Sequence, residues 1–99
     1  MREDDLDFLA DTTEQTSTRF VCFITPGMRR FDLAITTTQH FYGKKMVTDL
    51  QSGRTAIIGP DDLEEEGYLQ YAFRLSDEEA EELYKFLLQV VGPIEFPET

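Results

Sequence analysis

The alternation of apolar and polar positions predicts a meander of about four antiparallel strands in the first half of the chain. Four segments are short, rich in β-branched and aromatic residues, and bounded by turn-forming residues. These segments are residues 18–24, 31–38, 45–50 and 54–58. Ser52-Gly53 lies between the last two segments, and a glycine there supplies the positive φ angle that a tight hairpin needs.

The first of these segments is apolar on both faces. Phe20, Cys22 and Ile24 alternate with Val21 and Phe23. A strand with two apolar faces is usually covered on both sides. We therefore expect this strand to be internal, with a helix or a second subunit as its second cover. On the same argument, we expect Cys22 to be a buried and unreactive thiol.

Helical signals dominate after residue 59. Gly59-Pro60 predicts a short helix, because proline fits the first turn, and residues 68–73 favour a second helical segment. Ser76 and Glu79 have the spacing of a capping box. Behind it, apolar residues recur at helical spacing: Ala80, Leu83, Tyr84, Leu87, Val90 and Val91. The predicted fold class is α+β, with the sheet packed by a short helix and a longer C-terminal helix.

The chain of 99 residues is long enough for one domain. Residues 1–11 hold five acids, so we expect a flexible acidic arm or a segment that is ordered against a partner or against the chain's own basic middle. Residues 12–92 are predicted to form the single α+β domain. Residues 93–99 are a C-terminal tail that is either loose or lies along a sheet edge.

Charge is segregated along the sequence, whose formal net charge is −11. Residues 1–18 carry −5, residues 19–58 carry +4 and residues 59–99 carry −10. So acidic a chain is repelled as a whole by nucleic acid and by anionic lipid. The sequence shows no secretory signal and no apolar run of the ~20 residues that a membrane span needs, so we expect a cytoplasmic protein without a membrane partner.

Reactive side chains are scarce, and we predict no catalytic, cofactor-binding or metal-binding residue and no cofactor. His40 is the only imidazole and Cys22 the only thiol, which disfavours a Cys-His nucleophile and a zinc set. His40 beside Tyr42 could border a site, although a plain surface histidine is the simpler interpretation. The acids of residues 61–66 lack the spacing of a calcium loop. We interpret them as a solvated helix face and leave cation binding open.

The basic middle offers the best candidate interaction surface. Its residues are cations and neighbouring aromatics: Arg29, Arg30, Phe41, Tyr42, Lys44 and Lys45. The two basic pairs converge if the second and third strands are paired neighbours. Aromatic rings beside cations on a small sheet are a common way of holding single-stranded nucleic acid. The overall charge opposes such binding, and neutralisation by the acidic arm or the C-terminal helix is simpler.

Several segments together resemble a known family. The segments are residues 30–33, 41–44, 50–54, 56–63, 72–73, 75–76 and 78–83, and the resemblance spans roughly residues 19–88. The chain resembles a family of small, uncharacterised cytosolic proteins of Gram-positive bacteria, known only as a domain of unknown function. The resemblance implies a bacterial cytoplasmic setting, and it implies no activity.

From the scarcity of reactive residues and the surplus of aromatic and segregated charged residues, we predict a non-enzymatic protein-interaction or regulatory module. A homodimer that buries one sheet face or edge is a second hypothesis. The alternatives are a nucleic-acid-binding module that uses the four cations of the basic middle, and an acidic mimic of nucleic acid. A metal-dependent enzyme ranks last.

Overall fold

The computed structural model describes residues 6–92, which form a four-stranded antiparallel sheet followed by three α-helices. The strands are β1 (Ser17–Ile24), β2 (Arg30–Thr37), β3 (Lys45–Asp49) and β4 (Thr55–Ile58), and they lie in the order β1-β2-β3-β4. Each strand pairs with the next in antiparallel register. The predicted meander is therefore confirmed, and β1 is an edge strand of the sheet.

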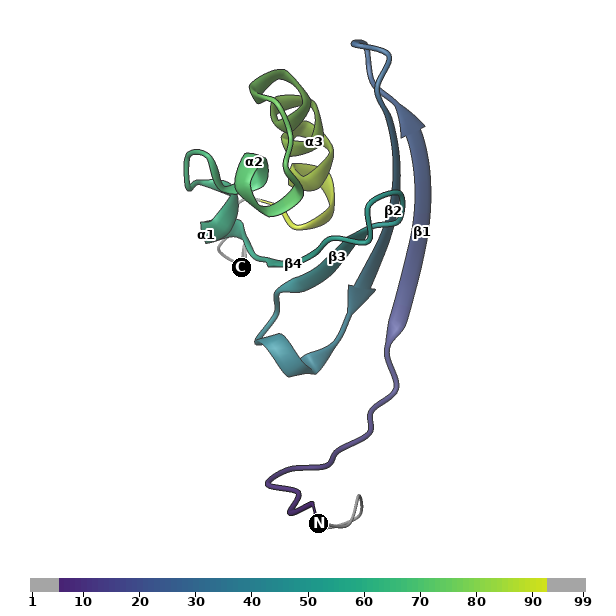
Figure 1. The fold of residues 1–99 in the computed structure, drawn as a ribbon, viewed down its shortest axis with the longest axis vertical. Helices are drawn as coiled ribbons and strands as arrows, with labels where there is room; N and C mark the ends of the chain where they lie inside the picture. Colours follow the sequence, from purple (N-terminus) through teal and green to yellow (C-terminus); the bar gives the residue numbers. More distant parts are fainter. Residues whose placement is uncertain (1–5, 93–99) are drawn as a thin grey trace, which may run out of the picture.

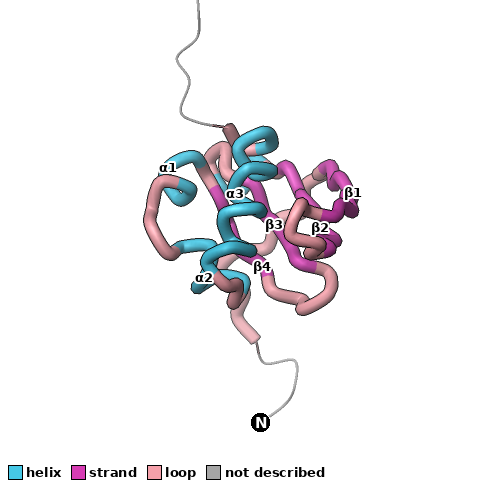
Figure 2. The backbone as a smooth tube through the Cα atoms, turned by 90° about the horizontal axis from the view of Figure 1, so that it is seen from above, coloured by secondary structure: helices cyan, strands magenta, loops and turns pink. Residues whose placement is uncertain are grey.

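The helices lie together on one side of the sheet (Figure 1). They are α1 (Pro60–Leu63), α2 (Tyr68–Phe73) and α3 (Asp77–Val90), and a 3-10 turn, η1 (Gln39–Phe41), joins β2 to β3. Seen from above, the helices stack in front of the strands, and β1 is at the side far from α1 (Figure 2). The predicted α+β class, with a short helix and a longer C-terminal helix, is confirmed.

The sequence specifies the start and the packing face of α3. The Ser76 hydroxyl accepts a hydrogen bond from the Glu79 amide at 3.1 Å, and the Glu79 carboxylate accepts one from the Ser76 amide at 3.0 Å. This reciprocal pair satisfies two amides that the first turn would leave unpaired. Ala80, Leu83 and Leu87 on the predicted stripe are buried, so the capping box and the core face agree.

The core lies between the helices and the face of the sheet that we call the inner face. Phe31, Leu33, Ile35, Val47, Ala56 and Ile58 from the strands meet Leu63, Leu69, Phe73, Leu75, Ala80, Leu83 and Leu87 from the helical half. Burial of these side chains is the main favourable contribution to folding. α3 also packs a second side against β1, because the Phe86 and Phe23 rings lie 4.6 Å apart.

The two outer hairpins are held by polar contacts at their turns. In the β1–β2 hairpin, the Thr25 amide donates to the Arg29 carbonyl at 2.9 Å. In the β3–β4 hairpin, the buried Asp49 carboxylate accepts from the Gln51 amide at 3.0 Å and from the Ser52 hydroxyl at 2.9 Å. Gly53 has φ +80° there, which confirms the predicted positive φ angle.

The expectation that the first strand is internal is wrong. β1 has β2 as its neighbour on one side only. Val21 and Phe23 face the helices and are half-buried, whereas Phe20 and Ile24 on the other face are 71 % and 64 % exposed. Cys22 is exposed as well, so the predicted buried thiol is also wrong. Within residues 6–92 the helices cover one sheet face, and the chain supplies no second layer for the other.

Residues 6–16 run away from the sheet beyond the start of β1 (Figure 1). Leu6, Phe8 and Leu9 in this segment are 68 %, 75 % and 99 % exposed. The first five residues of the predicted acidic arm and the whole predicted tail, residues 93–99, lie outside the described residues. None of the helices within residues 6–92 is long and apolar enough to cross a membrane.

Candidate interaction surface

The six residues of the predicted interaction surface do not form one patch. β2 and β3 are paired neighbours, as the prediction required, but the pairing is antiparallel and sets Lys45 opposite Thr37. Arg30 begins β2 and Thr37 ends it, which separates the two basic pairs by about 23 Å along the strand. The expected convergence of Arg29-Arg30 with Lys44-Lys45 is therefore wrong.

The first basic pair is occupied by carboxylates of the same chain. Arg29 Nη1 donates to Glu79 Oε2 of α3 at 2.9 Å, and its guanidinium lies 5.0 Å from the centre of the Phe31 ring. Arg30 Nε donates to Asp32 Oδ2 at 3.0 Å. The hydrogen bond from the Ser76 amide, and then the charge of Arg29, hold the pKa of Glu79 below its ordinary value.

Lys44 of the second basic pair joins the sheet to α1. Its Nζ lies 3.0 Å from Asp62 Oδ2 and 3.6 Å from Asp61 Oδ2. The hydrogen bond to Asp62 raises the pKa of Lys44. Asp62 also accepts from the Gly59 amide at 2.8 Å. Two acids of α1 thus neutralise a cation of the basic middle, whereas the sequence had suggested the acidic arm or the C-terminal helix, which pairs with Arg29 instead.

The aromatic part of the predicted surface lies on η1 and the turn after it. Phe41 is half-buried and its ring meets that of His40 edge-on, with centres 5.3 Å apart. Tyr42 is 98 % exposed at φ +55°. Glu14 accepts from the Thr38 hydroxyl at 2.8 Å and from the Gln39 amide at 3.2 Å.

The contacts of Glu14 fix the point at which the N-terminal segment leaves the domain. The Thr38 hydroxyl first, and then the Gln39 amide, lower the pKa of the Glu14 carboxyl. Glu14 Oε1 also lies 3.6 Å from His40 Nδ1. His40 thus lies beside Glu14 on the surface, in keeping with the interpretation as a surface histidine.

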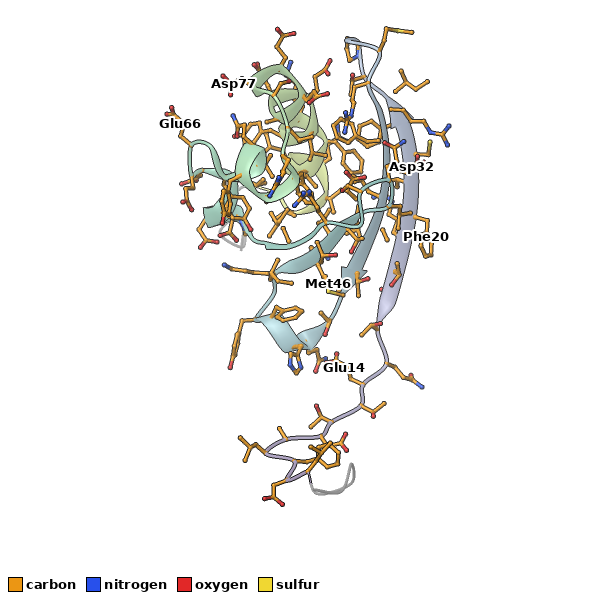
Figure 3. The ribbon with its side chains drawn as sticks, viewed as in Figure 1. Glu14, Phe20, Asp32, Met46, Glu66 and Asp77 are labelled. Carbon is orange, nitrogen blue, oxygen red and sulfur yellow. The ribbon has the colours of Figure 1, made fainter. Side chains whose placement is uncertain are left out.

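The helices leave uncovered the opposite face of the sheet, which we call the outer sheet face. It carries apolar and threonine side chains, and by register they form two rows: Phe20, Ala34, Thr48 and Thr55 in one, and Thr18, Thr36, Met46 and Ile57 in the other. Figure 3 labels Phe20, Asp32 and Met46, which lie on this face. Among residues 6–92, no helix packs against it.

The polar groups of the outer sheet face are paired with one another. The hydroxyls of Thr18 and Thr36 lie 2.8 Å apart, as do those of Thr48 and Thr55. Asp32 accepts from Arg30 and, at 3.0 Å, from Gln51 Nε2. The face therefore presents little uncompensated charge, although the molecule is strongly acidic, and it suits an uncharged partner surface.

Cys22 lies opposite Asp32 on this face. The Asp32 carboxylate beside the thiol raises the pKa of Cys22, which disfavours the reactive thiolate. His40 follows the far end of β2, beyond Thr37, so the single thiol and the single imidazole are not neighbours. Within the described residues, no three Cys, His, Asp or Glu side chains gather closely enough to hold a metal ion.

Within residues 6–92, no strand pairs with the side of β1 that faces away from β2. The Thr25 amide bonds to the Arg29 carbonyl, and the Leu50 amide bonds to the Asp32 carbonyl. Since hydrogen-bonded and non-hydrogen-bonded pairs alternate in an antiparallel ladder, the odd-numbered residues of β1 face β2. The backbone groups of the even-numbered residues face away from β2: Thr18, Phe20, Cys22 and Ile24. We call this row the β1 edge.

A shallow groove lies beside the end of β1, between the β1–β2 hairpin and α3. Its volume is about 390 Å³. It is lined by apolar side chains and bordered by two charged residues of α3: Phe23, Ile24, Pro26, Phe86, Glu82 and Lys85. Arg29 and Arg30 follow at the same end of the hairpin. Both guanidinium groups are paired with carboxylates of their own chain, so the groove contributes mainly its apolar lining at this end of the sheet.

The sequence suggested a homodimer that buries a sheet face or edge, but it placed the first strand inside the sheet, because that strand was judged by its composition alone. The position of this strand in the predicted meander indicates instead that it is an edge strand. In a meander the first strand has a neighbour on one side, so β1 must be an edge. The helical signals after residue 59 provide one layer, which covers one sheet face.

Comparison with known proteins gives one family. The family model described as SAV0927-like matches residues 9–89, more than three quarters of the chain. The matched region therefore includes the end of the N-terminal segment, the whole sheet and nearly all of α3. The sequence matches no curated protein.

Proposed function

The chain belongs to the SAV0927-like family of uncharacterised small proteins, and on this premise we propose that it is a non-enzymatic protein-interaction module. The proposed setting is the cytoplasm of a Gram-positive bacterium, in keeping with the resemblance drawn from the sequence. The partner is a protein with an apolar, uncharged patch that packs against the outer sheet face. A regulatory role would follow from the partner's own activity.

The observation that carries this proposal is the bare outer sheet face. Phe20 and Ile24 are exposed there, and Met46 and Ile57 are half-buried. Exposed apolar area of this kind commonly marks a protein interface when polar residues surround it. Here the polar residues of the same face, the paired threonines and the Arg30–Asp32 pair, lie beside these apolar side chains.

The ion pairs support a protein partner over a nucleic acid. A phosphate backbone is attracted by cations that are free to meet it, whereas Arg29, Arg30 and Lys44 each lie against a carboxylate of their own chain. Titration with labelled single-stranded RNA and DNA at low salt tests this point, because electrostatic binding is strongest there. We expect no binding.

The test of the proposal compares baits that differ at one surface. Met46→Lys and Ile57→Lys place a charge on the outer sheet face, on β3 and β4 and away from the β1 edge. Tyr71→Lys is the matched control, because Tyr71 is 86 % exposed on α2, on the helical side. Each bait captures proteins from the source bacterium, and the captured protein is then purified and titrated calorimetrically.

We expect the purified partner to bind wild type and Tyr71→Lys equally, and to bind Met46→Lys and Ile57→Lys at least tenfold more weakly. A partner that binds all outer-face variants as well as wild type, and is lost from a helical-side variant, would contradict the proposal. Binding of that kind by a basic DNA-binding protein would instead favour the acidic mimic.

A further inference from the structure

We propose that the β1 edge pairs with the β1 edge of a second copy of this chain, which makes one continuous eight-stranded sheet. This inference rests on the proposed function, because it names the partner that occupies one border of the outer sheet face. The two copies would be related by a two-fold axis, with their β1 strands antiparallel.

The β1 edge lacks the features that normally prevent strand pairing. Exposed edge strands are usually short or carry proline, lysine or a bulge. β1 is eight residues long, its sequence is Ser-Thr-Arg-Phe-Val-Cys-Phe-Ile, and all eight residues follow regular register with β2. Its one charged side chain, Arg19, lies over the Phe86 ring at 6.0 Å, on the inner side of the sheet. The edge is thus open to another strand.

Backbone geometry selects one register for the two copies. In an antiparallel pair, residues whose backbone N–H and C=O groups face the neighbouring strand lie opposite residues whose backbone groups face back. The residues of the β1 edge must therefore lie opposite residues of the β1 edge in the second copy. Only when Thr18 lies opposite Ile24 of the second copy, and Phe20 opposite Cys22 of the second copy, are all four residues of the β1 edge paired. In this register the two Phe20 rings are diagonal neighbours on the outer sheet face, a separation that aromatic side chains bridge.

Repulsion between two copies is limited at the β1 edge, because β1 itself carries no acidic residue. The acids that give the chain its charge of −11 are concentrated in the N-terminal segment and the helical half, away from the β1 edge. In the proposed register, Ser17 of the second copy lies opposite Thr25. The N-terminal segment of that copy therefore continues past the hairpin end, where the 390 Å³ groove is found.

The apolar side chains of that segment suit the same end of the sheet. Leu6, Phe8 and Leu9 are exposed within the single chain, and the groove offers Phe23, Ile24 and Phe86 as an apolar lining. Matching apolar surface thus meets at both ends of the two-fold arrangement. An isologous contact of this kind repeats each interaction twice.

The oligomeric state of the full chain tests the inference by sedimentation equilibrium from about 5 to 200 μM. We expect wild type to reach twice its 11.5 kDa mass. Cys22→Pro removes an outward amide and leaves the β1–β2 ladder intact, since proline is tolerated where the N–H faces solvent. Phe20→Lys is the second variant, and Tyr71→Lys is the control.

Cys22→Pro and Phe20→Lys should each weaken dimerisation more than tenfold while circular dichroism stays as in wild type, and Tyr71→Lys should leave it unchanged. Register is tested by oxidation: Phe20→Cys should form intermolecular disulfides faster than wild type and faster than Phe20→Cys/Cys22→Ser. Monomeric wild type at 200 μM, or edge variants as dimeric as wild type, would overturn the inference.

Failure of the dimer and failure of the proposed protein partner give different results, because different variants test them. Met46 and Ile57 lie on β3 and β4 and take no part in the β1 edge, so their variants report on the protein partner alone. A monomeric wild type whose partner still depends on Met46 overturns only the dimer. A β1-dependent dimer without any such partner overturns only the proposed role of the outer sheet face.

Discussion

Glu82 of α3 accepts a 2.7 Å hydrogen bond from the hydroxyl of Thr25, a buried residue in the turn between β1 and β2. Its second carboxylate oxygen accepts from the Gly27 amide, also at 2.7 Å. One side chain of the helix thus holds the turn of a hairpin that lies more than fifty residues earlier in the chain. This contact fixes the end of the sheet at which the groove and the β1 edge meet.

Glu82→Ala is expected to destabilise the protein by about 1–3 kcal/mol, because two donors, one of them on buried Thr25, lose a charged acceptor. Urea denaturation at one protein concentration measures the change. Glu81→Ala is the matched control, since Glu81 is the exposed neighbour on the same helix. Equal losses for the two variants would mean that the hairpin contact contributes little.

Glu79 gives the protein a defined sensitivity to acid. Its pKa is lower in the folded chain than in the unfolded chain, chiefly through the Ser76 amide. The folded state therefore binds this proton more weakly. The stability that Glu79 contributes is fully present above about pH 4.3, the ordinary pKa of glutamate, and is lost as the pH falls through the lower folded value.

The corresponding experiment compares wild type with Glu79→Gln from pH 7 to pH 3. Wild type should be more stable at pH 7, and the difference between the two urea midpoints should shrink as the pH falls below about 4.3. Glu78→Gln lies in the same first turn and controls for the helix dipole. A difference between wild type and Glu79→Gln that does not change with pH would contradict the assignment.

The elements of this fold could be predicted because their signals are local. The capping box of Ser76 and Glu79 and the glycine at position 53 depend on neighbours within a few residues. Alternation is local too: Phe31, Leu33 and Ile35 recur at every second position of β2, and all three are buried. Fold class followed from the order of these elements.

Which elements cover a strand could not be predicted from local sequence signals, because the cover comes from distant parts of the chain. β1 has the composition of a buried strand, yet its outer side chains face no helix within residues 6–92. The predicted convergence of the two basic pairs was wrong for a related reason. Neighbouring strands bring residues together only when direction and register also agree, and antiparallel pairing sent Arg30 and Lys45 to opposite ends.

Asp49 is expected to be essential to the β3–β4 hairpin, because its buried carboxylate is the acceptor for the turn. Asp49→Ala should cost about 1–3 kcal/mol of unfolding free energy, since the Gln51 amide loses its partner. Asp49→Asn keeps an oxygen acceptor and should cost clearly less. Chemical denaturation of the two variants provides the comparison, and equal losses would show that acceptor geometry is unimportant.

Position 59 requires glycine because the Lys44 side chain packs closely against it. The backbone angle of Gly59 does not require glycine. Its φ is −117°, which any residue adopts. A Cβ at this position would lie 2.9 Å from Lys44 Cγ and 3.0 Å from Asp61 Oδ1. Gly59→Ala should therefore destabilise the protein by about 1 kcal/mol, because Lys44 must move from the position in which it meets Asp62.

A double-mutant cycle isolates this contact. Removing the Lys44 side chain beyond Cβ takes away the nearest clashing atom, while alanine at position 59 still restricts the unfolded chain, which is favourable. In a Lys44→Ala background, Gly59→Ala should be neutral or stabilising, so the sign of its effect changes between the two backgrounds. Urea midpoints of the four proteins provide the measurement. The same destabilisation in both backgrounds would place the cost of alanine at Asp61 or in the backbone, and the packing of Lys44 over Gly59 would then not explain the glycine.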